Sequence, residues 1–157
     1  MRPPFRRRGE KIVAELGGPQ RRALASLPAL LAGVGRDRSD PAAARLTPPL
    51  HRDDPRADRR LRELIDPTLE EARGGDRGIF LETLEREPLR LSPEEAEAWV
   101  RVIGEGRLVL GARLGITEDG WSIDDLGGTQ EAMLFGYLSW LQDHLVTELL
   151  ATFEGDR

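Results

Sequence analysis

The residues best suited to chemistry are His144 and Glu148, which lie four positions apart near the C-terminal end of the sequence. On a helix, that spacing would let both side chains reach one metal ion. A metal site needs a third and a fourth ligand, and the other histidine, His51, lies in a distant polar stretch. The sequence contains no cysteine, which excludes thiolate metal sites, disulfides and thiol redox switches. We therefore expect an exposed His144–Glu148 pair and no metal site.

Other groups that could be catalytic have simpler structural explanations. Capping and the helix dipole account for three carboxylates at a helix start, Glu94, Glu95 and Glu97. Three glycines do not join a strand to a helix, as a phosphate-binding loop would: Gly104, Gly106 and Gly111. Three serines lack the surroundings of a nucleophile: Ser26, Ser122 and Ser139. The sequence therefore predicts no enzyme, no catalytic residue and no cofactor.

Two groups of residues could instead bind a macromolecule. Arg6, Arg7 and Arg8 form a basic N-terminal segment that could contact phosphate. The chain has a net charge of −5, however, so DNA binding is an alternative and not the main hypothesis. Trp121 lies in an acidic stretch with isolated apolar residues. Its indole either folds back onto the core or anchors a protein partner.

The charges are divided unevenly along the chain. Residues 1–62 carry 15 basic and 7 acidic side chains, whereas residues 63–157 carry 8 basic and 21 acidic ones. Such a division can create a dipolar surface that steers a partner. The two halves could equally neutralise each other across the fold.

The composition predicts a packed domain outside the membrane. Hydrophobic residues make up 39% of the chain, enough for a core in a chain of 157 residues. The apolar run at 23–34 follows arginines and mimics a signal peptide, but Glu10 and Glu15 precede it and its leucines have helical spacing. We interpret the run as a helix and expect a cytoplasmic protein with no membrane partner.

Helix starts are marked by a proline after a capping or flexible residue. The marks are Gly18-Pro19, Asp40-Pro41, Asp54-Pro55, Asp66-Pro67 and Ser92-Pro93. They predict a mainly α single domain, residues 1–157, built as a bundle of about six helices. Residues 1–16 read as a small β-hairpin with a turn at Gly9, and residues 89–91 as a third short strand.

Shorter helices are expected between residues 19 and 86. The first carries Pro28, which should kink it or restart it. The others span 41–46, 55–66, 67–73 and 77–86, with a break at Gly74-Gly75. Leu61, Leu64, Ile65 and Leu69 share one helical face, and Phe80, Leu81 and Leu84 are expected to be buried.

A long helical hairpin is predicted for residues 92–153. Its helices, about 92–115 and 129–153, should pack antiparallel, with Trp99 and Trp140 between them. Three glycines in the first helix indicate a bend or the close approach of another helix. The last helix carries a leucine stripe flanked by further apolar residues, and a homodimer through this helix is a further prediction. The stripe is Leu134, Leu138, Leu141, Leu145 and Leu149.

Four strings of sequence carry a family resemblance. They are Leu108-Val-Leu-Gly-Ala-Arg-Leu-Gly-Ile-Thr-Glu118, Tyr137-Leu-Ser-Trp-Leu-Gln-Asp-His-Leu145, Phe5-Arg-Arg7 and His51-Arg-Asp-Asp-Pro55. Over nearly its whole length the chain resembles an actinobacterial family of unknown function that includes the oxidative-stress transcriptional regulator AosR. The resemblance implies a cytoplasmic regulator of transcription that contacts a protein such as a sigma factor. It assigns no functional residue, and without cysteine the chain cannot sense oxidants through thiols.

The main functional hypothesis is therefore a non-enzymatic regulator that acts by protein–protein contact. Two alternatives remain open. One is a direct DNA-binding regulator that uses the arginine-rich N-terminus. The other is a small-molecule sensor with a pocket between the two long helices.

Overall fold

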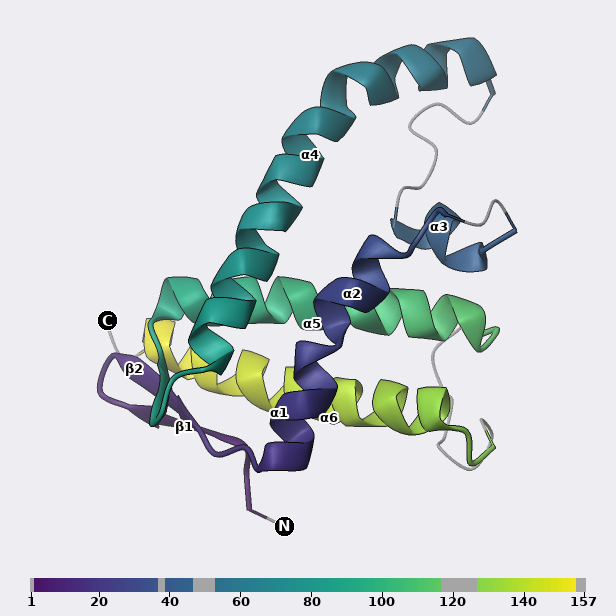
Figure 1. Cartoon of the computed structure of the whole chain (residues 1–157). Coiled ribbons are helices and arrows are strands. Elements are labelled where there is room, and N and C mark those ends of the chain that lie inside the picture. The colour runs from purple at the N-terminus through teal and green to yellow at the C-terminus, as the bar shows by residue number, and fades with distance from the viewer. Residues whose placement is uncertain (1, 37–38, 47–52, 117–126, 155–157) are drawn as a thin grey trace.

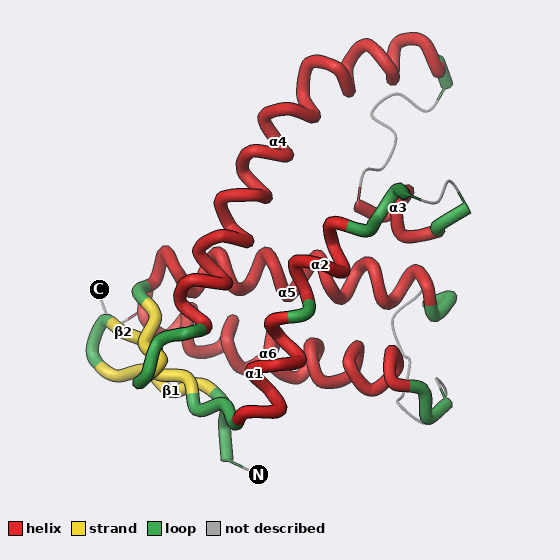
Figure 2. Tube along the Cα trace, viewed as in Figure 1, coloured by secondary structure: helices red, strands yellow, loops and turns green. Residues whose placement is uncertain are grey.

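The structure is a computed structural model that describes residues 2–36, 39–46, 53–116 and 127–154. The fold is mainly α with a small antiparallel sheet, as predicted (Figures 1 and 2). Trp121 and His51 lie outside the described residues, so the expectations about them stay predictions. The elements in chain order are β1 (Phe5–Arg8), β2 (Lys11–Ala14), α1 (Gly18–Ala25), α2 (Leu27–Ala32), α3 (Pro41–Leu46), α4 (Pro55–Leu84), β3 (Leu89–Leu91), α5 (Pro93–Arg113) and α6 (Gln130–Glu154).

The three strands form one sheet in the order β1-β2-β3, which confirms both the hairpin and the third strand. Gly9 makes the tight turn with a φ of 63°, a value that costs glycine little because it has no Cβ. Phe5 pairs with Ala14, and Ile12 pairs with Leu91. Because side chains alternate across a strand, these residues face the core and their neighbours face outward.

Helix α5 is the central element, and α2, α3, α4 and α6 all contact it. Its start is the predicted capping box, in which Ser92 Oγ accepts from Glu95 N at 3.1 Å and Glu95 Oε1 accepts from Ser92 N at 2.9 Å. Its glycines allow close packing, as predicted. A Cβ at Gly106 would lie 3.1 Å from Leu27 Cδ2 of α2 and 3.2 Å from Leu138 Cδ1 of α6.

Trp99 is fully buried, but it packs differently from the prediction. Its indole lies edge-on to Phe5 of β1, with ring centroids 6.2 Å apart, and 4.7 Å from Phe80 of α4. It therefore joins α5 to the sheet and α4. Trp140 of α6 is partly buried and contacts the rings of Tyr137 and His144.

Helix α4 is the largest departure from the sequence prediction. The expected breaks at Asp66-Pro67 and at Gly74-Gly75 are absent, and one helix of 30 residues runs through them. A proline inside a helix removes one hydrogen bond and bends the helix without having to end it. Figure 1 shows α4 curving away from α5 and α6 toward its N-terminal end. Leu81, expected to be buried, is 41% exposed, whereas Phe80 and Leu84 are buried.

Candidate interaction surfaces

Helix α4 begins at a well-formed cap but stands almost free of the core. Asp54 Oδ1 accepts hydrogen bonds from the backbone N–H groups of Arg56 and Ala57, at 3.1 and 3.2 Å. From Pro55 to Ile79 no residue is buried. An isolated helix in water is marginally stable without a packed face. The residues of α4 before Arg73 therefore form a helical arm, whereas Arg73 and Arg77 already bind α3 and α5.

The arm carries an apolar face that nothing described covers. Leu61, Leu64, Ile65 and Leu69, here called the α4 stripe, follow the spacing of one helical face, as predicted. Their exposed fractions are 38%, 76%, 37% and 41%. A contiguous exposed apolar face is typical of a protein-contact surface.

Charge changes sign along the same arm. Its first turns carry Arg56, Arg59, Arg60 and Arg62, and the following turns carry Glu63, Asp66, Glu70 and Glu71. The boundary between the basic and acidic parts of the whole chain thus falls inside α4. The arm combines an apolar stripe with a basic end and an acidic middle.

The predicted N-terminal arginines have separate roles in the structure. Arg6 pairs with Glu15 across the hairpin. The backbone N–H of Arg7 donates to Glu148 Oε2 at 3.0 Å, and its Nη1 donates to the Ala151 carbonyl at 2.8 Å. Arg6 therefore stabilises the hairpin, and Arg7 joins the sheet to α6.

Arg8 belongs to a different group, the basic sheet face, which sequence reasoning did not identify. Its side chain lines a shallow surface hollow with Lys11, Val13 and Arg90. Within the described part of the chain, the three cationic side chains have no carboxylate partner. The alternation of side chains along the strands could have predicted this group, because residues 8, 11 and 90 all occupy outward positions of paired strands.

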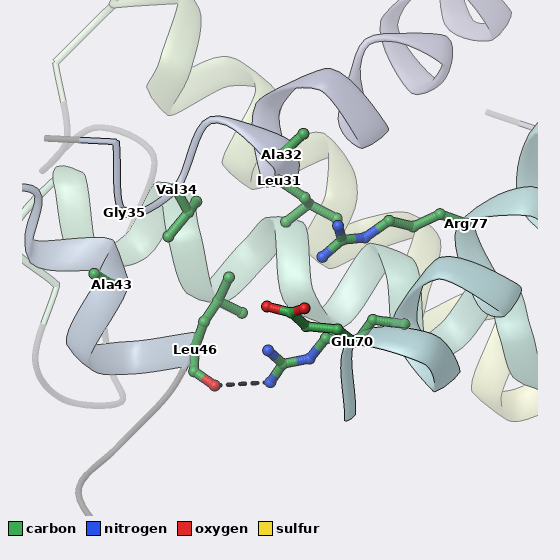
Figure 3. A pocket seen from close by; sticks show the side chains of 9 residues that line it. Leu31, Ala32, Val34, Gly35, Ala43, Leu46, Glu70 and Arg77 are labelled. Carbon is green, nitrogen blue, oxygen red and sulfur yellow. Dashed lines mark hydrogen bonds between the residues drawn. The ribbon is translucent and has the colours of Figure 1, made fainter. Parts of the chain in front are cut away.

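A pocket of about 360 Å³ lies between α2, α3 and α4, not between the two long helices (Figure 3). Leu31 and Leu46 form apolar parts of its wall, and Figure 3 shows Glu70 and Arg77 reaching toward them from α4. Arg73 Nη2 donates to the Leu46 carbonyl at 2.8 Å.

Glu105 of α5 balances the charge behind this pocket. It contacts Arg77 Nη2 at 3.1 Å and Arg73 Nε at 3.6 Å. The Nε of Arg77 is buried without a hydrogen-bond partner among the described residues. The pocket lining thus carries two arginines and one carboxylate, and Glu105 behind it supplies a second carboxylate that balances the charge.

Ion pairs elsewhere fix the smaller elements to α5. Asp40, just before α3, accepts from Arg113 Nη2 at 2.9 Å, and this guanidinium holds the pKa of Asp40 below its usual value of 3.8. Arg86 likewise lowers the pKa of Glu95 through a hydrogen bond. Both pairs join a connecting segment to α5, and their role is structural.

His144 and Glu148, expected to be an exposed pair, are both half-buried and have other contacts. The His144 ring lies 5.0 Å from the Trp140 ring, and Glu148 accepts the Arg7 backbone N–H. Among the described residues, no group of three or more histidines and carboxylates could hold a metal ion. No helix in the described ranges is long and apolar enough to cross a membrane.

The leucine stripe of α6 is used inside the molecule. Leu138, Leu141, Leu145 and Leu149 are buried, and α6 packs on α5 and β1. These four residues therefore confirm the stripe as an inward face, and Met133 at its edge is 64% exposed. The homodimer through the residues that flank the stripe stays a prediction.

Comparison with known proteins places the chain in a family. A family model described as a domain of unknown function, DUF2017, matches residues 1–149. No curated protein and no solved structure matches the chain. The match spans the sheet, α1 to α5 and most of α6, so it includes the α4 arm and the basic sheet face. The chain therefore belongs to the DUF2017 family.

Proposed function

We propose that this protein is a cytoplasmic, non-enzymatic regulator that modulates transcription by contacting a protein of the sigma-factor or RNA-polymerase type. The resemblance to the actinobacterial family that includes AosR supports the link to transcription and to the oxidative stress response. The input is not a thiol switch, because the chain has no cysteine.

The observation that carries the protein–protein part of this proposal is the uncovered α4 stripe. A helical arm without a buried residue between Pro55 and Ile79 gains a packed face when a protein covers it. An apolar helical face docks on another protein and not on DNA, whose surface is dominated by phosphate.

Binding to purified proteins tests this function. The intact protein is immobilised, and RNA polymerase core and individual sigma factors from an actinobacterium are passed over it. We expect one of them to bind the wild-type protein and to bind Leu64→Glu at least about tenfold more weakly, because that change puts a charge in the contact. Met133→Glu is the matched control, since Met133 is similarly exposed on α6. Absence of binding to every one of these proteins contradicts the proposal.

The basic sheet face supports a second candidate, direct DNA binding. Arg8, Lys11 and Arg90 present three cations without carboxylate partners in the described part of the chain. Each phosphate neutralised contributes a slope of about −0.9 to log K against log salt. An electrophoretic shift that weakens with salt and disappears in Arg8→Glu, but not in Arg36→Glu, would favour this alternative. No shift by the intact protein at low salt ends it.

A further inference from the structure

We propose that α4 pairs with α4 of a second copy of this chain in antiparallel orientation, with the two-fold axis close to Ile65. The inference rests on the proposed function only in treating α4 as a protein-contact surface. It names the occupant of the α4 stripe. Three features of α4 support it: the register of the apolar residues, the order of the charges, and the placement of charges beside the stripe.

Three of the four residues of the α4 stripe are arranged symmetrically about Ile65, whereas Leu64 has no apolar counterpart because position 66 is an aspartate. Leu61 and Leu69 lie four positions before and after it, on the same face. In an antiparallel pair centred on Ile65, that residue meets the Ile65 of the partner subunit. Leu61 meets the partner's Leu69, and Leu69 meets the partner's Leu61. A two-fold interface requires this self-complementarity, because the same patch is used on both copies.

The order of the charges selects the antiparallel direction. Residues 56–62 carry four arginines and one aspartate, whereas residues 63–71 carry four carboxylates and no cation. An antiparallel pair places the basic segment of each copy beside the acidic segment of the other. A parallel pair would place the four arginines of the two copies side by side, which is repulsive.

The flank of the α4 stripe shows the same complementarity in detail. Arg60 and Glu71 are 11 positions apart, about three helical turns, so they lie on the same side of the stripe, beyond its Leu64 edge and about 120–140° around the helix from Ile65. In an antiparallel helix pair, each flank faces the same flank of the other helix. Their long side chains can reach around this edge, so Arg60 approaches the partner's Glu71, and the pair occurs twice. Both residues are exposed, and neither has an ion-pair partner among the described residues.

This pairing also accounts for the length of the free helix. Figure 1 shows the N-terminal half of α4 projecting away from α5 and α6. The pair would supply the missing packed face of residues 55–72. The transcription protein of the proposed function would then compete with the second copy for the α4 stripe.

Cysteine cross-linking tests the register directly, because the natural chain contains no cysteine. Ile65→Cys should form a disulfide-linked dimer in mild oxidant, since the two thiols meet at the axis. Leu61→Cys alone should not form this disulfide. Position 61 of one copy lies about 12 Å from position 61 of the other along the helix axis, which is beyond the reach of a disulfide. Leu61→Cys mixed with Leu69→Cys should cross-link. Leu150→Cys, at an exposed position of α6, is the control for random collision.

Light scattering on the unmodified protein gives the oligomeric state. We expect a dimer at micromolar concentration, and a monomer for Leu61→Glu with unchanged helix content in the body. A monomeric wild-type protein overturns the inference. Equal cross-linking of Ile65→Cys and Leu61→Cys overturns the antiparallel arrangement, since a parallel pair aligns both positions. Cross-linking of Leu150→Cys at the same rate as Ile65→Cys overturns the interface.

Charge exchange provides a second, independent test. Arg60→Glu makes both flanking positions acidic, and Glu71→Arg makes both basic, so each variant alone should dimerise about tenfold more weakly. Mixing the two variants should restore dimers as heterodimers. The double variant Arg60→Glu/Glu71→Arg should also dimerise again. Failure of the mixture to associate while both variants remain folded contradicts the proposed pairing.

These outcomes are separate from those of the proposed function. A dimer that binds neither RNA polymerase nor a sigma factor retains the inference and removes the function. A monomer that binds one of them through the α4 stripe retains the proposed function and removes the dimer inference.

Discussion

The indole Nε1 of Trp99 donates a 2.7 Å hydrogen bond to Oγ1 of Thr83, deep inside the core. The two residues are 0% and 1% exposed. Thr83 Oγ1 also donates to the Ile79 carbonyl at 2.7 Å, so the hydroxyl serves as donor and acceptor. This bond joins α5 to the last turns of α4, the part of α4 that is buried.

Replacing Thr83 by valine should therefore destabilise the protein. The change keeps the shape but leaves the indole N–H buried without an acceptor, which costs about 1–3 kcal/mol in the free energy of unfolding. Urea denaturation followed by tryptophan fluorescence measures it. Thr147→Val is the control, because that hydroxyl donates to the Asp143 carbonyl on the exposed side of α6. Equal stability of the two variants would show that the Thr83 bond is dispensable.

Gly75→Ala should stabilise α4. A Cβ at this position meets no atom within 4 Å. Removing a glycine from a helix interior gains about 0.5–1 kcal/mol, since the unfolded chain loses freedom. We expect slower amide hydrogen exchange along the arm and higher helix content near the melting temperature. Faster exchange would mean that the helix does not run continuously through residue 75.

Gly106→Val should have the opposite effect. A Cβ there already lies within 3.2 Å of Leu27 and Leu138, and two further methyl groups would push α2 and α6 away from α5. Overpacking of this kind costs about 1–3 kcal/mol. Chemical denaturation compares it with Gly75→Val, which adds the same side chain in open space. A smaller loss at residue 106 than at residue 75 contradicts the close packing of the three helices.

Acid should weaken the contact between Asp40 and Arg113. The pKa of Asp40 is lowered first by the hydrogen bond from Arg113, then by that from the Ala42 N–H. A lowered folded-state pKa contributes stability above the usual value of 3.8, and this is lost as the pH falls through the folded-state pKa. Asp40→Asn should therefore show a smaller fall in unfolding free energy below about pH 4. Urea curves at a series of acidic pH values test this, and parallel pH profiles would contradict it.

The single tyrosine gives a direct test at high pH. Burial raises the pKa of Tyr137 to about 12, because the phenolate would lose its hydration in this partly buried position. A raised folded-state pKa means that the buried, protonated phenol contributes its full stability below pH 10.0, the usual pKa of tyrosine. This contribution is lost as the pH rises from there toward 12. Absorbance of tyrosinate should titrate near 12 in the folded protein and near 10.0 in guanidinium. Coincident curves would place the ring in solvent.

The sequence predicted element starts well because caps are local. The Ser92 capping box and the Asp54 cap both use residues within three positions of the helix start. The Gly9 turn and strand alternation identified the hairpin for the same reason. Pro67 misled the prediction, because a proline at a helix start and a proline inside a helix are preceded by similar residues. Whether the helix starts at Pro67 or continues through it depends on the backbone hydrogen bonds on either side of the proline. The residue pair Asp66-Pro67 alone does not contain that information.

The candidate surfaces were harder to predict. Leu61, Leu64, Ile65 and Leu69 were correctly placed on one face, but periodicity cannot say whether that face is covered. The basic sheet face was partly missed, since Arg90 joins Arg8 and Lys11 through strand pairing across about 80 residues of chain.

Local chemistry in the chain thus specified the mainly α class, the hairpin, the helix caps, the absence of thiol chemistry and the family. Long-range packing settled the rest. It buried the leucines of α6, placed Trp99 between the sheet and α4, and left the α4 stripe uncovered. The physical reason is that the apolar pattern of a helix shows which face is more stable away from water. It does not show what packs on that face, because the covering element comes from a distant part of the chain or from another molecule.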